Sequence, residues 1–141
     1  MPAPARPRTG VAADGRDGLR DQRRIATRKP APYLVNQAWI RGHHFYVDER
    51  VIVPRSYIGE LLDGGLDSVL VDARAITTAL DLCTGSGCLA ILMAHTFPDA
   101  TVDAVELSKD AAAVAARNID GHALADRVHL HTGDLFAPLA G

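Results

Sequence analysis

The second half of the chain alternates short apolar segments with segments of helical periodicity. The apolar run at 75–82 predicts a buried strand, and further strands are expected at 101–106 and 127–132. A helix from about Gly87 to Thr96 and another between Ser108 and Gly121 separate them. Short connections in a strand–helix–strand–helix–strand order predict an α/β fold with a parallel sheet and right-handed crossovers.

Both helices carry an apolar stripe. The first is expected to bury Leu89, Leu92, Met93 and Thr96, and Pro98 prevents its continuation. The second is expected to bury Ala111, Val114, Ala115 and Asn118.

The first half of the chain has a different pattern. Short strands are predicted at 38–40, 45–47 and 51–53, followed by a helix that Ser56 caps, that buries Ile58, Leu61 and Leu62, and that ends at Gly64-Gly65. Residues 1–18 lack periodicity and are expected to be disordered, whereas 19–29 could form a short basic helix. Three regions follow: an arm at 1–32, a hairpin with a linking helix at 33–66, and the α/β unit at 67–141.

Charge is unevenly distributed along the 141 residues. Residues 1–30 hold eight basic and three acidic side chains, a charge of +5. Residues 31–141 hold seven basic and fourteen acidic side chains, a charge of −7. The basic arm could contact RNA weakly, although a solvated tail is the simpler interpretation. No apolar segment matches a membrane span or a secretion signal, and the cytoplasm is the expected location.

The candidate site lies where the first predicted strand meets its helix. Asp81 ends the apolar run, and Gly85 and Gly87 allow a sharp turn and close approach of a ligand. The following helix offers unpaired N–H groups. Glu106 and Asp134 end the next two strands, so three carboxylates should meet at one edge of the sheet. This arrangement predicts a nucleotide-type cofactor site.

Asp81 favours one cofactor over another. The run Gly85-Ser86-Gly87-Cys88-Leu89-Ala90 also fits the dinucleotide pattern G-x-G-x-x-A, so an NAD-binding oxidoreductase fragment is an alternative. A carboxylate beside a pyrophosphate would be repelled, whereas S-adenosylmethionine carries an ammonium and a sulfonium and no phosphate. A strand–turn–helix without a ligand is the third interpretation.

No metal site is predicted. His129 and His131 share one face of a strand but lack a third ligand, and zinc sites use three or four protein ligands. His43-His44 is expected in an exposed turn. Cys83 is interpreted as structural, because no basic side chain lies near it in sequence.

Four segments, at 45–56, 80–88, 97–100 and 133–136, resemble the glutamine methyltransferases that modify translation proteins (the PrmB, PrmC and HemK group). The resemblance spans residues 23–136 and implies a Rossmann-like, S-adenosylmethionine-dependent methyltransferase fold, of which this chain holds the N-terminal half of the sheet. Ser56-Tyr57 after Pro54-Arg55 favours the branch that methylates a glutamine side-chain amide in a large-subunit ribosomal protein. The branch acting on peptide release factors is the alternative.

The resemblance also implies roles for individual residues. The backbone around the turn would hold the methionine end of the cofactor, through Cys83, Thr84, Gly85, Ser86 and Gly87. Glu106 would take the ribose hydroxyls, and Asp134 with Leu135 would lie beside the adenine. Arg55 falls where the family brings its substrate loop near the site.

The family's Asn-Pro-Pro-Tyr motif, which orients the glutamine amide, follows a fourth strand and would lie beyond Gly141. No catalytic residue is therefore assigned among the 141 residues. The resemblance implies a fragment truncated at both ends, which alone should transfer little or no methyl. The strand at 75–82, central in the full sheet, would then be an apolar edge. A non-catalytic remnant that binds a ribosomal partner through the basic arm is a further interpretation.

Overall fold

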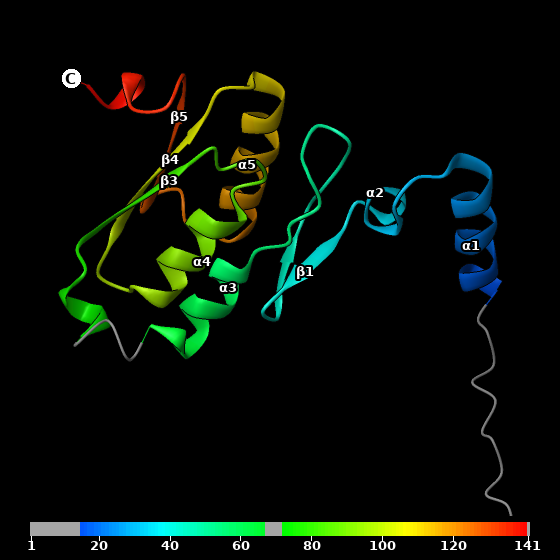
Figure 1. Cartoon of the computed structure of the whole chain (residues 1–141), viewed down its shortest axis with the longest axis horizontal. Coiled ribbons are helices and arrows are strands. Elements are labelled where there is room, and N and C mark those ends of the chain that lie inside the picture. The colour runs from blue at the N-terminus through cyan, green and yellow to red at the C-terminus, as the bar shows by residue number, and fades with distance from the viewer. Residues whose placement is uncertain (1–14, 67–71, 141) are drawn as a thin grey trace, which may run out of the picture.

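The fold is built around a three-stranded parallel sheet in the order β3-β4-β5. This computed structural model describes residues 15–66 and 72–140. Strands β3 (Thr78–Leu82), β4 (Thr101–Glu106) and β5 (Val128–Thr132) are connected by helices α4 (Cys88–Thr96) and α5 (Lys109–Gly121) (Figure 1). The predicted α/β order is confirmed. Strand β4 has the predicted bounds, and β5 begins one residue later than expected.

Two of the sequence-based expectations concern the ends of the chain. The disorder expected at residues 1–18 lies outside the described residues as far as residue 14, and it is wrong at 15–18, which begin a helix, α1 (Gly15–Thr27). Gly141, beyond which the resemblance puts the Asn-Pro-Pro-Tyr motif, also lies outside the described residues. Nothing in the described residues tests where the motif lies, so the assignment of no catalytic residue to this chain stays a prediction.

The prediction of a buried first strand is wrong. Ala75 belongs to a short 3₁₀ helix, η2 (Ala73–Ala75), and β3 begins only at Thr78. Within the described part of the chain β3 pairs with β4 alone, so it is the edge of the sheet, as the resemblance implied. The side chain of Leu80 is 39% exposed, since the described residues leave one face of this strand open.

Helix α4 is buried on nearly all sides, not along a single stripe. It contacts β3 and β4 on one side and the segment from α3 (Tyr57–Glu60) to η1 (Leu61–Gly65) on another. As a consequence the small and apolar residues Cys88, Ala90, Ile91, Leu92 and Ala94 are buried, whereas the predicted Leu89, Met93 and Thr96 are only half-buried.

Helix α5 follows its predicted pattern. The hydroxyl Oγ of Ser108 accepts a hydrogen bond from the amide of Ala111 at 3.3 Å, which caps the helix. All four residues of the predicted stripe are buried: Ala111, Val114, Ala115 and Asn118.

The N-terminal region contains α2 (Ala31–Val35) and an antiparallel hairpin of β1 (Ala38–Ile40) and β2 (His43–Phe45). The predicted second strand therefore begins two residues too late, and His43-His44 lies in a strand and not in a turn. No strand forms at 51–53, because the amide of Val51 closes a turn onto the Asp48 carbonyl at 3.1 Å. The predicted cap of α3 by Ser56 is confirmed. The predicted burial of Ile58 is wrong, because this residue is 52% exposed.

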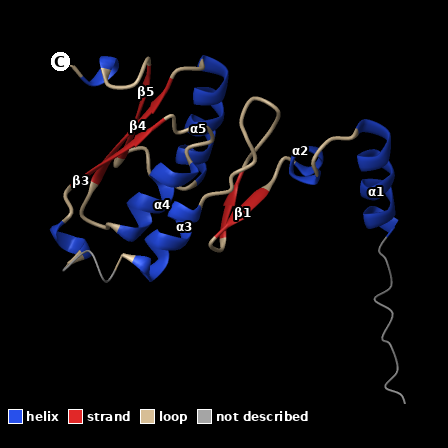
Figure 2. Ribbon diagram, in the orientation of Figure 1, coloured by secondary structure: helices blue, strands red, loops and turns tan. Residues whose placement is uncertain are grey.

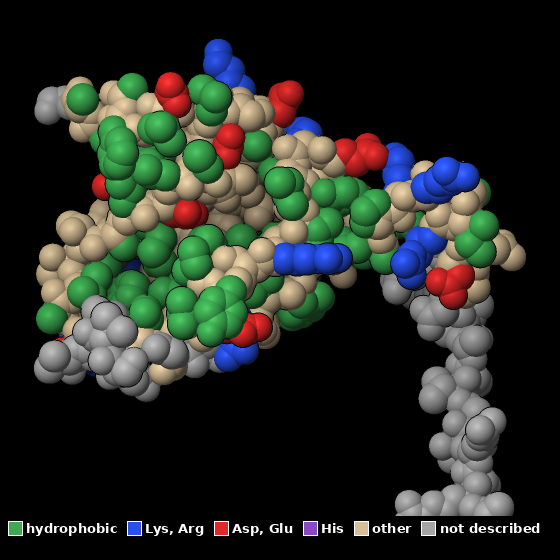
Figure 3. Space-filling model, in the orientation of Figure 1, with side chains coloured by type: hydrophobic (Ala, Val, Ile, Leu, Met, Phe, Trp, Pro, Cys, Tyr) green, Lys and Arg blue, Asp and Glu red, His purple; other side chains and the backbone are tan. Residues whose placement is uncertain are grey.

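Helix α1 (Gly15–Thr27) confirms the short basic helix and begins earlier than expected. It stands apart from the sheet and its helices (Figures 1 and 2), and Lys and Arg side chains gather over it (Figure 3). Leu19 and Ile25 are 61% and 81% exposed. Among the helices described, none has the length and apolar character to cross a bilayer.

Two apolar clusters hold the layers together. The larger joins the covered face of the sheet to α4, the C-terminal part of α5 and Phe45 of the hairpin. The smaller packs the hairpin segment against the start of α5, through Ala38, Val47, Val51, Ala111 and Val114. The hairpin is thus fixed to the helix that follows β4.

Candidate functional site

The turn between β3 and α4 departs repeatedly from ordinary backbone geometry. Cys83, Gly85 and Gly87 have φ angles of 61°, 58° and 79°, in the left-handed region. This conformation costs a non-glycine residue such as Cys83 about 1–2 kcal/mol. Strained residues of this kind persist where the surroundings hold them, and they are concentrated at ligand sites.

Gly87 is also required by packing. A Cβ atom at this position would lie 3.3 Å from both Cα and Cβ of Ala115 on α5. A Cβ at Gly85 would meet nothing within 4 Å, so the turn is open at that residue. The turn therefore lies tightly against α5 on one side and leaves space on the other.

Asp81 supports the turn from below. Its Oδ2 accepts hydrogen bonds from the Thr84 hydroxyl at 2.6 Å and the Ala90 amide at 3.1 Å. Burial raises the pKa of this carboxyl, and the hydrogen bonds from Thr84 and Ala90 oppose that rise. Both hydrogen bonds go to Oδ2, so Oδ1 is the oxygen that can accept from a ligand.

Glu106 joins the turn to the end of β4. Its Oε2 accepts from the Gly85 amide at 2.8 Å, and its Oε1 accepts from the Ser108 amide at 3.0 Å. A carboxylate has about four lone-pair positions, so two remain for a ligand. The predicted convergence of Asp81, the turn and Glu106 is therefore present at the carboxyl ends of β3 and β4.

A cavity of about 680 Å³ opens over this convergence. Its floor contains Asp81, Glu106 and the turn residues Cys83 to Ser86, and residues 50–56, Arg55 among them, form a wall. The volume is in the usual range for small-molecule pockets, about 300–1,000 Å³. Cys83 is exposed and lines this cavity.

Asp134 and Leu135 lie beside the cavity and not in its lining. Both are exposed and follow β5, whose end is tied to that of β4 by a hydrogen bond from the Gly133 amide to the Glu106 carbonyl at 3.0 Å. Their contact with an adenine stays a prediction.

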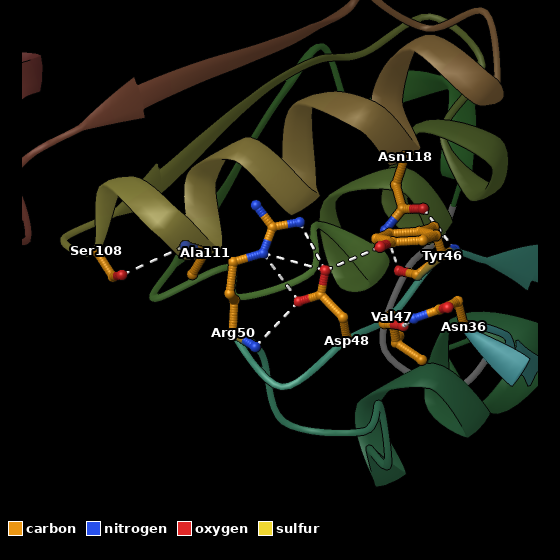
Figure 4. A network of polar contacts seen from close by, with 8 residues as sticks. All are labelled: Asn36, Tyr46, Val47, Asp48, Arg50, Ser108, Ala111 and Asn118. Atoms are coloured by element: carbon orange, nitrogen blue, oxygen red, sulfur yellow. Dashed lines mark hydrogen bonds and ion pairs between the residues drawn. The ribbon is translucent and has the colours of Figure 1, made fainter. Parts of the chain in front are cut away.

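Asn118 positions the site, a role that the sequence pattern did not reveal. It is buried, and its Nδ2 donates to the carbonyls of Ser86 at 2.8 Å and Tyr46 at 3.0 Å. Its Oδ1 accepts from the Tyr46 amide at 2.7 Å (Figure 4). One side chain thus ties the glycine turn, α5 and the hairpin together. The sequence held one signal for this role, which is that the polar Asn118 occupies a position in the otherwise apolar stripe of α5.

The wall at 50–56 is held by charge. Arg50 donates to both carboxylate oxygens of Asp48, at 2.6 Å from Nη2 and 2.9 Å from Nε, and Tyr46 donates its hydroxyl to the same carboxylate (Figure 4). The hydrogen bonds from Arg50 hold the pKa of Asp48 well below its usual range. The guanidinium of Arg117 lies over the Tyr46 ring, 3.5 Å from its centroid.

Comparison with known proteins assigns this geometry to a family. Residues 62–141 match the model of the methyltransferase small domain. The chain is 63% identical over 122 residues to a ribosomal protein uL3 glutamine methyltransferase of Bradyrhizobium diazoefficiens, covering 82% of this chain and 38% of that protein. A protein of the same name from Burkholderia pseudomallei is 59% identical over 118 residues, with 84% and 38% covered.

Among solved structures, an RNA methyltransferase from Salinibacter ruber in complex with S-adenosyl-L-homocysteine is 29% identical, with 60% of this chain and 52% of that chain covered and a TM-score of 0.48. This chain spans about two fifths of the length of the curated relatives. The matched family model covers more than half of the chain. The chain therefore belongs to the methyltransferase small domain family.

Proposed function

We propose that this chain forms the cofactor-binding part of an S-adenosylmethionine-dependent methyltransferase that acts on a glutamine side-chain amide of ribosomal protein uL3. The observation that carries the proposal is the pair of carboxylates, Asp81 and Glu106, which flank a strained glycine turn on the floor of a cavity. The identity to curated relatives of that name supports the substrate class.

The residues present fit the proposed cofactor better than a dinucleotide. Asp81 and Glu106 add negative charge on either side of the turn, which attracts a methionyl ammonium and a sulfonium and repels a pyrophosphate. The open space at Gly85 admits a ligand close to the main chain. The turn backbone and Asp81 would hold the methionine end, and Glu106 would accept from the ribose hydroxyls.

When bound, S-adenosylmethionine supplies an electrophilic methyl group on its sulfonium. The amide nitrogen of glutamine is a poor nucleophile, because its lone pair is delocalised into the carbonyl, so positioning must provide most of the rate. In this chain Asn118 holds the turn and the hairpin in register, and Arg50 with Asp48 holds the wall that carries Arg55. We infer that Arg55 orients the substrate loop.

Calorimetric titration tests the cofactor. We expect the purified chain to bind S-adenosylhomocysteine saturably and to show no heat with NAD; the reverse result would identify an oxidoreductase fragment. Glu106→Gln should weaken binding about tenfold or more, because a charged acceptor is lost. Asp103→Asn on the same strand is the matched control, since Asp103 lies outside this cavity and pairs with His131 at 2.7 Å.

Methyl transfer tests the substrate. We expect little transfer by the 141-residue chain, whose sequence lacks the Asn-Pro-Pro-Tyr motif. A chimera that adds the flanking residues of the Bradyrhizobium relative after Gly141 and before the matched region should label uL3, a cytoplasmic ribosomal component, and not a peptide release factor. Label in the release factor alone would refute the ribosomal-protein assignment while leaving the cofactor site intact.

A further inference from the structure

Three histidines from distant parts of the chain meet on the side of the molecule away from the glycine turn. His43 begins β2, His95 lies in the last turn of α4, and His122 directly follows α5. Each offers a ring nitrogen, and these nitrogens all lie within 4.8 Å of one another. The rings of His43 and His95 are stacked with centroids 4.4 Å apart.

The hydrogen bonding of His122 selects its tautomer. Its Nε2 lies 2.8 Å from the carbonyl oxygen of His44, and a carbonyl can only accept, so Nε2 carries the proton. In the neutral ring Nδ1 then has its lone pair available, and this atom lies 3.5 Å from Nε2 of His95. Metal-binding histidines commonly donate their second nitrogen to a carbonyl in this way, which fixes the orientation of the ring.

The helix ends beside the cluster favour a bound cation. His95 and His122 stand at the C-terminal ends of α4 and α5, where the helix dipole leaves partial negative charge. Although His95 is exposed, its neighbours desolvate the ring in part, and this desolvation, together with the nearby His43, His122 and Arg127, lowers the pKa of His95. Arg127 brings a positive charge, but its guanidinium is engaged by the carbonyls of Ala94, Phe97 and Ala100.

The spacing matches the requirements of a transition metal. Zinc binds imidazole nitrogen at about 2.0–2.1 Å, so two tetrahedral ligands lie about 3.4 Å apart. The separation of 3.5 Å between His95 Nε2 and His122 Nδ1 already meets this value. The ring of His43 is stacked on that of His95, so it must turn about its side-chain bonds to direct a nitrogen at the same ion, and its ligating nitrogen lies within 4.8 Å of the other two. Three histidines with a water molecule as the fourth ligand form a known type of zinc site.

We propose that His43, His95 and His122 form a binding site for Zn²⁺ that fixes the β1–β2 hairpin to the C-terminal ends of α4 and α5. The nine residues of α4 separate this site from the glycine turn by about 13 Å, at 1.5 Å per residue. The site is therefore distinct from the cofactor cavity, and its existence does not depend on the proposed function.

The test is a titration of metal-free protein with ZnCl₂ alone, followed by calorimetry and by thermal unfolding. We expect one Zn²⁺ per chain and a Tm that rises with zinc concentration. His95→Gln should weaken zinc binding about tenfold or more, in the range seen when metal sites lose a supporting contact. Because His95 is exposed, this variant should fold, and unchanged circular dichroism and S-adenosylhomocysteine binding would confirm that it does.

A matched control separates this cluster from general histidine binding. The double variant His129→Gln, His131→Gln removes two histidines of β5 and should bind zinc as the wild type does. Co²⁺ as a spectroscopic probe should give a tetrahedral absorption spectrum in the wild type and lose it in His43→Gln. The proposal is overturned if the folded wild type binds no Zn²⁺, or if binding survives His95→Gln unchanged or is lost in the control.

Discussion

Replacing Asn118 by alanine should destabilise the protein more than any other single truncation of a polar side chain considered for this site. Asn118 is 3% exposed and makes three hydrogen bonds, two to the backbone of Tyr46 and one to the Ser86 carbonyl. Each contributes about 1 kcal/mol net, and the substitution leaves buried backbone groups without a partner, so we expect a loss of about 3 kcal/mol or more. This is a large part of the roughly 5–15 kcal/mol typical of a domain.

Urea unfolding provides the measurement, with far-UV circular dichroism reporting the helices and fluorescence of the single tryptophan, Trp39 of β1, reporting the hairpin. If the hairpin separates from α5 before the helices unfold, the fluorescence transition of Asn118→Ala will precede the dichroism transition. In the wild type the two transitions should coincide.

Asn36→Gly is the matched control. Asn36 is exposed, donates one hydrogen bond to the Val47 carbonyl at 3.1 Å, and has a φ of 53° that glycine also adopts (Figure 4). Its loss should cost about 1 kcal/mol or less. If Asn118→Ala destabilises the protein by no more than this control, Asn118 is not the residue that ties the turn to the hairpin.

Three further changes have expected outcomes. Gly87→Ala should lower stability and abolish S-adenosylhomocysteine binding, because it combines a φ of 79° with a Cβ placed 3.3 Å from Ala115. Gly85→Ala has open space around the new Cβ and should lower stability by only about 1–2 kcal/mol. Equal losses of the two variants in thermal unfolding would contradict this reasoning. Burial raises the pKa of Asp81 in the folded state, so the folded chain binds the proton more tightly than the unfolded chain does. The free energy of unfolding should therefore fall as the pH rises from about 3.9, the unfolded pKa, through the folded pKa. Asp81→Asn should lack this pH-dependent fall when unfolding is measured against pH. Deletion of residues 1–30 removes the basic arm and should weaken RNA binding in a filter assay. It should leave S-adenosylhomocysteine binding within about twofold, because α1 stands apart from the cavity. An unchanged RNA affinity would exclude the basic arm as a contact.

Local patterns predicted the elements of the α/β unit well. The bounds of β4, the Ser108 cap and the buried stripe of α5 follow from β-branched and apolar periodicity and from capping chemistry, which act within a few residues. The convergence of the turn with Glu106 was also accessible, because carboxyl ends of parallel strands meet at one edge.

Predictions failed where burial depends on distant segments. The same apolar run predicts a buried strand whether or not a neighbour covers it, yet β3 is an edge with Leu80 exposed. The apolar triplet at 51–53 forms no strand, because the Val51 amide closes a turn and the segment before it is bonded to Asn118, 72 residues from Tyr46 in sequence.

The order of strands and helices, the glycine turn and the carboxylates that follow the strands can all be inferred from the amino-acid sequence, since each depends on local backbone and side-chain chemistry. Which polar groups meet across layers depends on the packing of distant segments. Asn118 became a link between turn and hairpin, and His43, His95 and His122 became a cluster, when α4 and α5 packed against the hairpin. Such contacts join residues with no periodic relation, so no pattern along the chain contains them.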